Sequence, residues 1–295
     1  MTTTWHILGP GAIGSLFACY LQQSGLRVYL IDRNGISAPR TIDLVEGDHR
    51  VAHHFEGDDN HQPIHQLLVT VKAHQTATAL KSVSARLASG AIVLLLQNGM
   101  GTWLEAEPHI RDSVMLLGTT TEGANRPIPN QVNHAGRGET HIGALEPSQQ
   151  PIAEAVCQQW SGLSLQLAAD ADIRSRLWRK LAINCAINPL TAIYDCPNGE
   201  LLQKPAALSQ MQAICNEVET VMSLALERKS DGLYALAKSV AERTGENISS
   251  MLQDVRKRQP TEIDFITGYL LREAERLGTH CPHNEALYKQ VKQMY

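Results

Sequence analysis

Hydrophobic and polar positions follow two different periods along this chain. The change of period divides the chain into two parts. Short apolar runs of strand length, such as Thr4–Leu8, dominate the first part and alternate with amphipathic helical segments such as Ser15–Ser24. From Asp172 onward the pattern is almost wholly helical, and no clear strand is visible. The pattern predicts an α/β domain over 1–170, followed by an all-helical domain over 171–295.

A glycine-rich turn joins the first predicted strand to the first predicted helix. It reads Gly9-Pro10-Gly11-Ala12-Ile13-Gly14, and a second strand is predicted at Arg27–Ile31. A glycine pattern alone is weak evidence, but between a strand and a helix each glycine has a use. The three uses are a tight turn, a close approach of pyrophosphate to the backbone, and close helix packing. Because free N–H groups at a helix start bind phosphate, the arrangement favours a Rossmann-type dinucleotide-binding domain over a plain connection.

Two further apolar strands end in polar residues that are candidates for ligand binding. The strand Leu67–Val71 ends at Lys72, and the strand Ala91–Leu96 runs into Gln97-Asn98-Gly99. Open α/β sheets bind ligands at the carboxyl ends of their strands, so Lys72 and Asn98 are expected at the same edge as the glycine turn. Asn-Gly is also a common turn former that needs no ligand. The repeated placement at strand ends favours a functional interpretation.

The remaining strands of the first domain are expected in three places. The segment Thr41–His54 alternates around Gly47-Asp48 and predicts a hairpin inserted on the sheet. Val114–Thr121 predicts another strand. Gln131–His134 and Glu139–Ile142, which two glycines separate, predict a terminal hairpin.

A polar stripe on a buried helix is the strongest candidate for chemistry. Within Leu177–Leu202, the residues Lys180, Asn184 and Asn188 recur every four positions, so a helix places them on one face, about 6 Å apart along its axis. The residues around them are mostly apolar, which indicates burial on most sides. A lysine is seldom buried without a partner or a task, and neutral amides can hold its ammonium group without neutralising it. The alternative is a solvated stripe at a domain boundary.

A second polar stretch in the helical half predicts a helix start. Thr261 is a natural N-cap with Asp264 three residues on, which is a variant of the capping box, and Glu262 falls in the first turn. Glu262 alone would do no more than complement the helix dipole. Ser249 and Ser250 interrupt an apolar-periodic segment, and their hydroxyls could bind a carboxylate.

Composition and charge exclude several classes of protein. The chain has 295 residues, 43% hydrophobic content and a net charge of −4, so it can form two cores but lacks the positive charge typical of nucleic-acid-binding proteins. It shows neither a secretory leader nor an apolar run of the roughly 18 residues that a membrane span needs. We therefore expect a soluble, cytoplasmic protein that binds neither nucleic acid nor membrane. Its six cysteines form no C-x-x-C pair and are expected to be reduced.

A histidine-rich stretch raises the question of a metal site. It contains His53, His54, His61, His65, Asp58 and Asp59. The spacing matches no zinc pattern, so a solvated loop is the preferred interpretation and no metal is predicted.

The motifs described above carry a resemblance to a known family over nearly the whole chain. From the glycine turn through NGMG, LWRKLAINCAINPLTAIYDCPNGEL and NISSMLQD to TEID, the sequence resembles the ketopantoate reductases (2-dehydropantoate 2-reductases). The resemblance implies NADPH-dependent reduction of 2-dehydropantoate (ketopantoate) to (R)-pantoate, in pantothenate and coenzyme A biosynthesis. It also implies a Rossmann-type N-terminal domain, a helical C-terminal domain, and a monomer or homodimer.

The same resemblance assigns roles to individual residues, with Lys180 as the proton donor. It implies substrate contacts by Asn98, Lys180, Asn184, Asn188, Asn198, Ser250 and Glu262. It implies cofactor contacts by Gly9, Pro10, Gly11, Ala12, Ile13, Gly14, Arg33, Lys72, Asn98, Ala124 and Glu262. One departure is visible, because the family usually reads E-I-D-x-I-N-G and Thr267 here replaces the asparagine.

The residues alone leave the substrate and the cofactor open. The polar stripe would suit other small 2-keto or 3-hydroxy acids, and a non-catalytic NADPH sensor with the same fold would need no acid at Lys180. Asp32 ends the second strand, where an acid commonly binds the adenine ribose of NAD. Arg33 follows directly and suits a 2′-phosphate. We expect the protein to prefer NADPH to NADH, and we expect Asp32 to make this preference smaller.

Overall fold

The computed structural model describes residues 3–58 and 61–295, and the chain groups into two compact units. A sheet unit comprises Thr102–Arg174 and the residues up to Gln97, and a helical unit comprises Asn98–Gly101 and Ser175–Tyr295. The short segment Asn98–Gly101 therefore belongs to the helical unit, although a strand of the sheet unit ends at Leu95, shortly before it. Of the histidine-rich stretch, Asp59 lies outside the described residues.

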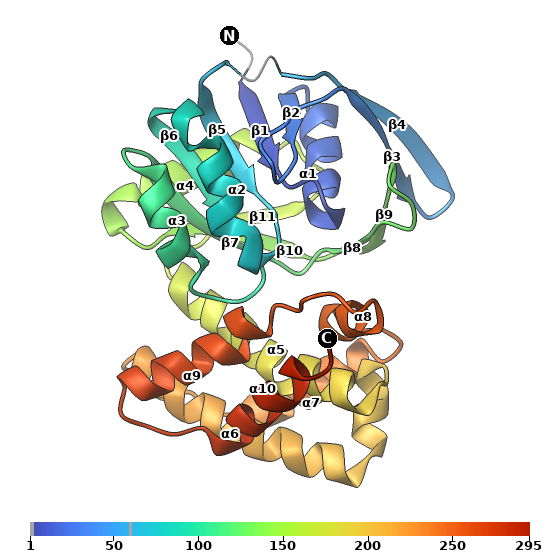
Figure 1. The fold of residues 1–295 in the computed structure, drawn as a ribbon, viewed down its shortest axis with the longest axis vertical. Coiled ribbons are helices and arrows are strands. Elements are labelled where there is room, and N and C mark those ends of the chain that lie inside the picture. Colours follow the sequence, from blue (N-terminus) through green and yellow to red (C-terminus); the bar gives the residue numbers. More distant parts are fainter. Residues whose placement is uncertain (1–2, 59–60) are drawn as a thin grey trace. The chain divides into compact units, whose positions relative to one another are not determined.

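The main sheet of the sheet unit has seven strands in the order β11-β10-β7-β6-β5-β1-β2 (Figure 1). β1, β2, β5, β6 and β7 are parallel, whereas β10 pairs with β7 in antiparallel fashion. This arrangement confirms the predicted Rossmann-type α/β domain. The strands are β1 (Thr4–Leu8), β2 (Arg27–Ile31), β5 (Ile64–Val69), β6 (Leu87–Leu95), β7 (Val114–Thr120), β10 (Glu139–Ala144) and β11 (Gln166–Ala169). The α-helices of the unit are α1 (Ala12–Gln23), α2 (Thr76–Val83), α3 (Thr102–Ile110) and α4 (Gln150–Gln159).

A second sheet forms beside the first, in the order β4-β3-β9-β8. Its strands are β3 (Arg40–Glu46), β4 (His49–Phe55), β8 (Gly123–Asn125) and β9 (Gln131–Gly136). The predicted hairpin around Gly47 is confirmed as β3 and β4, but it pairs with β9 and so builds a sheet of its own.

The predicted hairpin between Gln131–His134 and Glu139–Ile142 is wrong. β9 pairs with β3 and β8, while β10 pairs with β7 and β11 in the main sheet. The glycines between them mark a close passage of backbones instead of a hairpin turn. A Cβ atom at Gly138 would lie 2.4 Å from the carbonyl carbon of Thr121.

Helix α1 packs against both sheets, which explains why it is apolar in nearly every direction. It contacts β1 and β2 of the main sheet and β3, β8 and β9 of the second. Phe17 of α1 shares a core cluster with Trp5 of β1 and Val132 of β9. On its other flank, the Tyr20 hydroxyl donates to Glu46 Oε1 at 2.6 Å and hydrogen-bonds His134 Nδ1 at 2.8 Å. The second sheet is thus fixed directly to the helix that follows the glycine turn.

The helical unit is built around α5, whose sequence contains the polar stripe. Within Ser175–Tyr295 the structure shows no strand, as predicted. Trp178 and Leu181 of α5 are fully buried, and Trp178 packs edge-on against Tyr269 with ring centroids 5.7 Å apart. Thr267, where the family usually has asparagine, is buried as the first residue of α9. The helices are α5 (Ile173–Tyr194), α6 (Pro205–Ala225), α7 (Leu233–Arg243), α8 (Ser250–Arg256), α9 (Thr267–Arg276) and α10 (Pro282–Lys292), with the 3-10 turns η4 (Asn198–Gln203) and η5 (Ile263–Phe265).

The predicted capping box at Thr261 does not form. Thr261 Oγ1 accepts from the backbone N–H of Ile263 at 3.3 Å, but it precedes a short 3-10 turn, and α9 begins only at Thr267. Instead of returning to Thr261, the Asp264 carboxylate accepts from the Tyr288 hydroxyl at 2.5 Å. A tertiary partner has therefore displaced the local one. None of the helices among the described residues is long and apolar enough to cross a membrane.

Candidate functional site

The glycine turn has the backbone geometry that a close-packed turn requires, with one side left open. Gly9 has φ +82°, and a Cβ atom there would lie 2.3 Å from Val71 Cγ1. A Cβ at Gly14 would lie 2.2 Å from Thr70 Oγ1, so a side chain would push α1 away from β5. At Gly11 the nearest atom would be 3.9 Å away. The start of α1 therefore leaves space through which a phosphate could approach its N–H groups.

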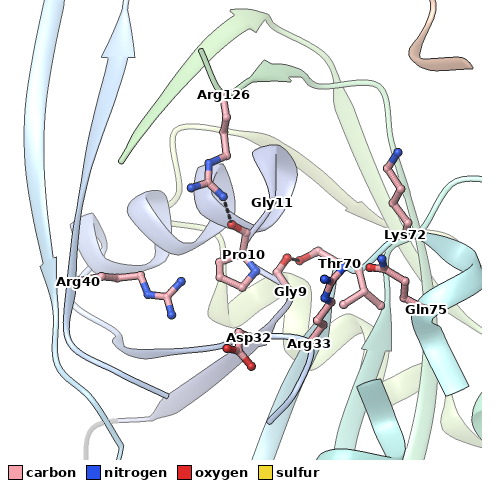
Figure 2. A pocket seen from close by; sticks show the side chains of 11 residues that line it. Gly9, Pro10, Gly11, Asp32, Arg33, Arg40, Thr70, Lys72, Gln75 and Arg126 are labelled. Carbon is pink, nitrogen blue, oxygen red and sulfur yellow. Dashed lines mark hydrogen bonds between the residues drawn. The ribbon is translucent and has the colours of Figure 1, made fainter. Parts of the chain in front are cut away.

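This turn forms part of a cavity of about 390 Å³ in the sheet unit (Figure 2). The predicted cofactor contacts Gly9, Pro10, Gly11, Arg33 and Lys72 all line it. Ala12, Ile13 and Gly14 form the first turn of α1, and Ala124 lies on β8. The sequence interpretation did not single out four polar residues that also line the cavity, namely Arg40, Thr70, Gln75 and Arg126.

The Asp32 carboxylate holds its own loop in place. Its Oδ1 atom accepts from the N–H of Asn34 at 2.8 Å and from the N–H of Ile36 at 3.1 Å. The N–H of Asp32 in turn donates to the carbonyl of Ile36 at 2.8 Å. Two backbone amides therefore occupy one of the two oxygens that could bind a ribose. The neighbouring Arg33 is exposed, and within the described residues it forms no ion pair.

In the helical unit, Lys180 is joined to Asn98, which lies 82 positions earlier in the sequence. The Lys180 Nζ donates to Asn98 Oδ1 at 2.8 Å. Burial lowers the pKa of Lys180 to about 8, and the negative charge of Glu262 opposes this shift. Because an amide oxygen carries no net charge, Asn98 orients the ammonium group without raising its pKa as a carboxylate would.

The loop that carries Asn98 is fixed against the turn that follows Glu262. The N–H of Met100 donates to the carbonyl of Phe265 at 2.8 Å. Gly99 has φ +83°, and a Cβ atom there would lie 2.5 Å from the same carbonyl oxygen. The glycine after Asn98 is thus required for close backbone packing, beyond its ordinary use in turns.

The other predicted substrate residues lie around α5. Asn184 and Asn188 are half-buried and continue the stripe from Lys180. Asn198 is buried in η4, where its Nδ2 donates to Thr244 Oγ1 at 2.8 Å. Its Oδ1 is a buried acceptor without a partner among the described residues.

Ser249 and Ser250 differ in their roles: the first is structural and the second is exposed. The Ser249 hydroxyl caps α8 by accepting from the N–H of Leu252 at 3.1 Å, and it lies 2.7 Å from Thr191 Oγ1 of α5. Ser250 is exposed as the first residue of α8. Of the two, Ser250 is the one whose hydroxyl remains accessible to a ligand.

The histidine-rich stretch is not the solvated loop that the sequence predicted, because His53 and His54 lie on β4, His65 lies on β5, and Asp58 is buried. His53 lies on β4, and its Nδ1 is 2.9 Å from Gln22 Oε1 of α1. Over residues 3–58 and 61–295, no three His, Cys, Asp or Glu side chains form a group that could hold a metal ion.

Comparison with known proteins covers both parts of the chain. Residues 5–147 match the family model described as "Ketopantoate reductase PanE/ApbA", and residues 172–295 match the model of its C-terminal part. The 2-dehydropantoate 2-reductase of Vibrio cholerae is 39% identical over 289 residues, which is 97% of this chain and 96% of the relative.

Solved structures show the same fold over almost the whole chain. A probable 2-dehydropantoate 2-reductase from Bacillus subtilis is 28% identical, with a TM-score of 0.80 and coverage of 99% of this chain and 100% of the other. A D-mandelate dehydrogenase solved with NADH is 25% identical, with a TM-score of 0.84 and coverage of 99% and 98%.

Proposed function

The chain belongs to the ketopantoate reductase family, and we propose that it reduces 2-dehydropantoate to (R)-pantoate with NADPH, on the route to pantothenate and coenzyme A. The observation that carries the proposed chemistry is the Lys180 ammonium group, which Asn98 orients and whose pKa is lowered to about 8. NADPH supplies the hydride in this reaction.

We assign to Lys180 the stabilisation and protonation of the substrate oxygen. When the ketone carbon accepts hydride, negative charge develops on the carbonyl oxygen, and an ammonium group within hydrogen-bond reach stabilises it. Lys180 then transfers a proton from Nζ to that oxygen and becomes a neutral amine. A pKa near 8 suits a general acid working near neutral pH, because the group is still mostly protonated but gives up its proton more readily than an ordinary lysine.

Glu262 has a supporting part in this proposal. Its charge raises the pKa of Lys180 against the effect of burial, so it keeps the acid charged at the working pH. The proposed direct contacts to substrate are made by Asn98, Lys180, Asn184, Asn188, Asn198, Ser250 and Glu262. The buried, unpartnered Oδ1 of Asn198 supports its place in this group, because it could accept a hydrogen bond from a substrate hydroxyl.

For the cofactor, we propose that Arg33 binds the 2′-phosphate of NADPH. Two features support this choice over NADH. Arg33 lines the cavity without a carboxylate partner within the described residues, and Oδ1 of the competing Asp32 already accepts from two backbone amides. The proposed cofactor contacts are Gly9, Pro10, Gly11, Ala12, Ile13, Gly14, Arg33, Lys72, Asn98, Ala124 and Glu262.

The D-mandelate dehydrogenase of the same fold supports a second candidate, a reductase for a different 2-keto acid that uses NADH. Steady-state rates with ketopantoate and a panel of other 2-keto acids, each with NADPH and with NADH, separate the two. We expect the highest kcat/KM for the pair of ketopantoate and NADPH. A higher kcat/KM for another 2-keto acid would reject the substrate assignment, and absence of turnover with every acid would favour an NADPH sensor.

The remaining parts of the proposal concern the protein as a whole. We propose two domains, 1–170 for the cofactor and 171–295 for substrate and catalysis, and a monomer or homodimer located in the cytoplasm. The separate family-model matches to residues 5–147 and 172–295 support the division.

A further inference from the structure

Two arginines of the second sheet, Arg40 and Arg126, point toward the glycine turn of the main sheet. Arg126 follows β8, and its Nη1 donates to the carbonyl of Pro10 at 2.6 Å, while its Nη2 donates to the carbonyl of Pro129. Arg40 is the first residue of β3. Figure 2 shows both guanidinium groups directed toward the glycine turn, and both line the cavity.

The two guanidinium groups are close enough to repel each other. Burial lowers the pKa of Arg126, and the positive charge of Arg40 lowers it further. Neither side chain has a carboxylate partner in the part of the chain that the structure describes. Two cations that share one cavity in this way are unfavourable unless an anion joins them.

The charge around the cavity is strongly unbalanced. Its lining contains the cations Arg33, Arg40, Lys72 and Arg126 but only one carboxylate, Asp32, which is already engaged with its own loop. The arginines enter from different elements. Arg33 follows β2, where the adenine ribose of a bound dinucleotide is expected. Arg126 is bonded to the residue directly before Gly11, at the start of α1, where a pyrophosphate is expected.

We propose that Arg126, assisted by Arg40, binds the pyrophosphate of the dinucleotide, so that the second sheet contributes directly to cofactor binding. A guanidinium group matches the paired oxygens of a phosphate, and an anion between the two arginines removes their repulsion. The hydrogen bonds of Tyr20 to Glu46 and His134 fix this sheet, which positions both arginines, to α1. This inference rests on the proposed function only in assuming that a dinucleotide binds.

The assignment differs measurably from that of Arg33, because NADH and NADPH share the pyrophosphate and differ in the 2′-phosphate. The test is the Kd of each cofactor, measured by fluorescence titration without substrate. Arg126→Ala should raise both Kd values by the same factor, about tenfold or more, as expected for loss of a charged hydrogen bond. Arg40→Ala should also raise both Kd values equally, but by a smaller factor than Arg126→Ala does. Arg33→Ala should weaken NADPH alone.

Two further variants separate charge from local structure. Arg126→Gln keeps a donor for the carbonyl of Pro10 but removes the charge, so it should bind both cofactors almost as weakly as Arg126→Ala. Arg27→Ala removes an exposed arginine at the opposite end of β2 and should leave both Kd values unchanged.

Three results would overturn the inference: unchanged Kd values in Arg126→Ala, a loss confined to NADPH, or wild-type binding in Arg126→Gln. Failure of the wild-type protein to bind either cofactor would also overturn it. Because no keto acid is present in the titration, a protein that shows the predicted pattern but fails to reduce ketopantoate would contradict the proposed reaction and leave this inference standing.

Discussion

Replacement of Lys180 by methionine should inactivate the enzyme and stabilise the protein at the same time. Burial lowers the pKa of Lys180 from 10.5 to about 8. At about 1.4 kcal/mol per pKa unit, this shift corresponds to about 3–4 kcal/mol by which the fold disfavours the charged lysine. The residue keeps partial exposure, so screening by water makes this an upper value.

Lys180→Met removes this cost but also removes the hydrogen bond to Asn98. Asn98 is itself only half-buried, so water can replace the lost donor at a small cost. We expect a net gain of about 1–3 kcal/mol in the free energy of unfolding at pH 7. The loss of the proposed general acid should lower kcat by about 10²- to 10⁴-fold.

The stability that Lys180→Met gains over wild type should depend on pH in a defined direction. Below about pH 8 the lysine is charged in both states, and the folded state bears the full cost of burial. Between about 8 and 10.5 the unfolded chain binds the proton more tightly, so wild-type stability rises with pH. Above the ordinary lysine pKa, neither state is charged and the difference between variant and wild type should largely vanish.

Urea unfolding of both proteins at a series of pH values measures this difference directly. Arg179→Met is the matched control, because it removes an exposed cation from the neighbouring position of α5 and should change neither stability nor kcat appreciably. The reasoning is refuted if Lys180→Met is less stable than wild type at pH 7, or if its stability gain does not decline at high pH. Near-normal turnover by the folded variant would remove Lys180 from the mechanism.

Three further predictions concern the residues around Lys180 and the choice of cofactor. Glu262→Gln removes the charge that keeps Lys180 protonated, so the pH at which the reduction rate falls should move below 8. KM for ketopantoate should rise, and the melting temperature should fall only modestly. An unchanged pH profile would contradict this role of Glu262. Gly99→Ala places a Cβ 2.5 Å from the carbonyl oxygen of Phe265 at φ +83°. The variant should lower the urea midpoint by the equivalent of about 1–3 kcal/mol, and it should also lower kcat because it displaces Asn98. A variant with wild-type stability would contradict this packing argument. Arg33→Ala should lower kcat/KM for NADPH by the equivalent of about 1.5–3 kcal/mol with little effect on NADH. Equal losses for both cofactors would contradict the assignment of Arg33 to the 2′-phosphate.

The sequence predicts the buried strands and the long apolar helices better than the other parts of the fold. β1 and β2 begin and end where the apolar runs do, because a buried parallel strand must be apolar on both faces. The Lys180 stripe was visible for a similar reason, since α5 is buried around it and its polar residues stand out.

The parts that the sequence did not predict depend on partners far away in the chain. The glycines near Gly138 suggested a hairpin, yet the choice of β7 and β11 as partners for β10 is a tertiary outcome that local turn residues do not encode. Arg126 was missed because its contact, Pro10, lies 116 positions earlier. The sequence predicts a capping box for Asp264 because it does not show that the partner, Tyr288, lies on another helix.

The pH dependence of catalysis in both directions tests most directly the claim that Lys180 transfers the proton in ketopantoate reduction. The measurement is kcat for NADPH oxidation with ketopantoate and for NADP⁺ reduction with (R)-pantoate, over a range spanning pH 6 to 10. Reduction requires the charged lysine and oxidation requires the neutral one, so the first rate should fall and the second should rise around pH 8, with both transitions absent in Lys180→Met. Two profiles that change in the same direction, or a transition that persists in the variant, would contradict the account.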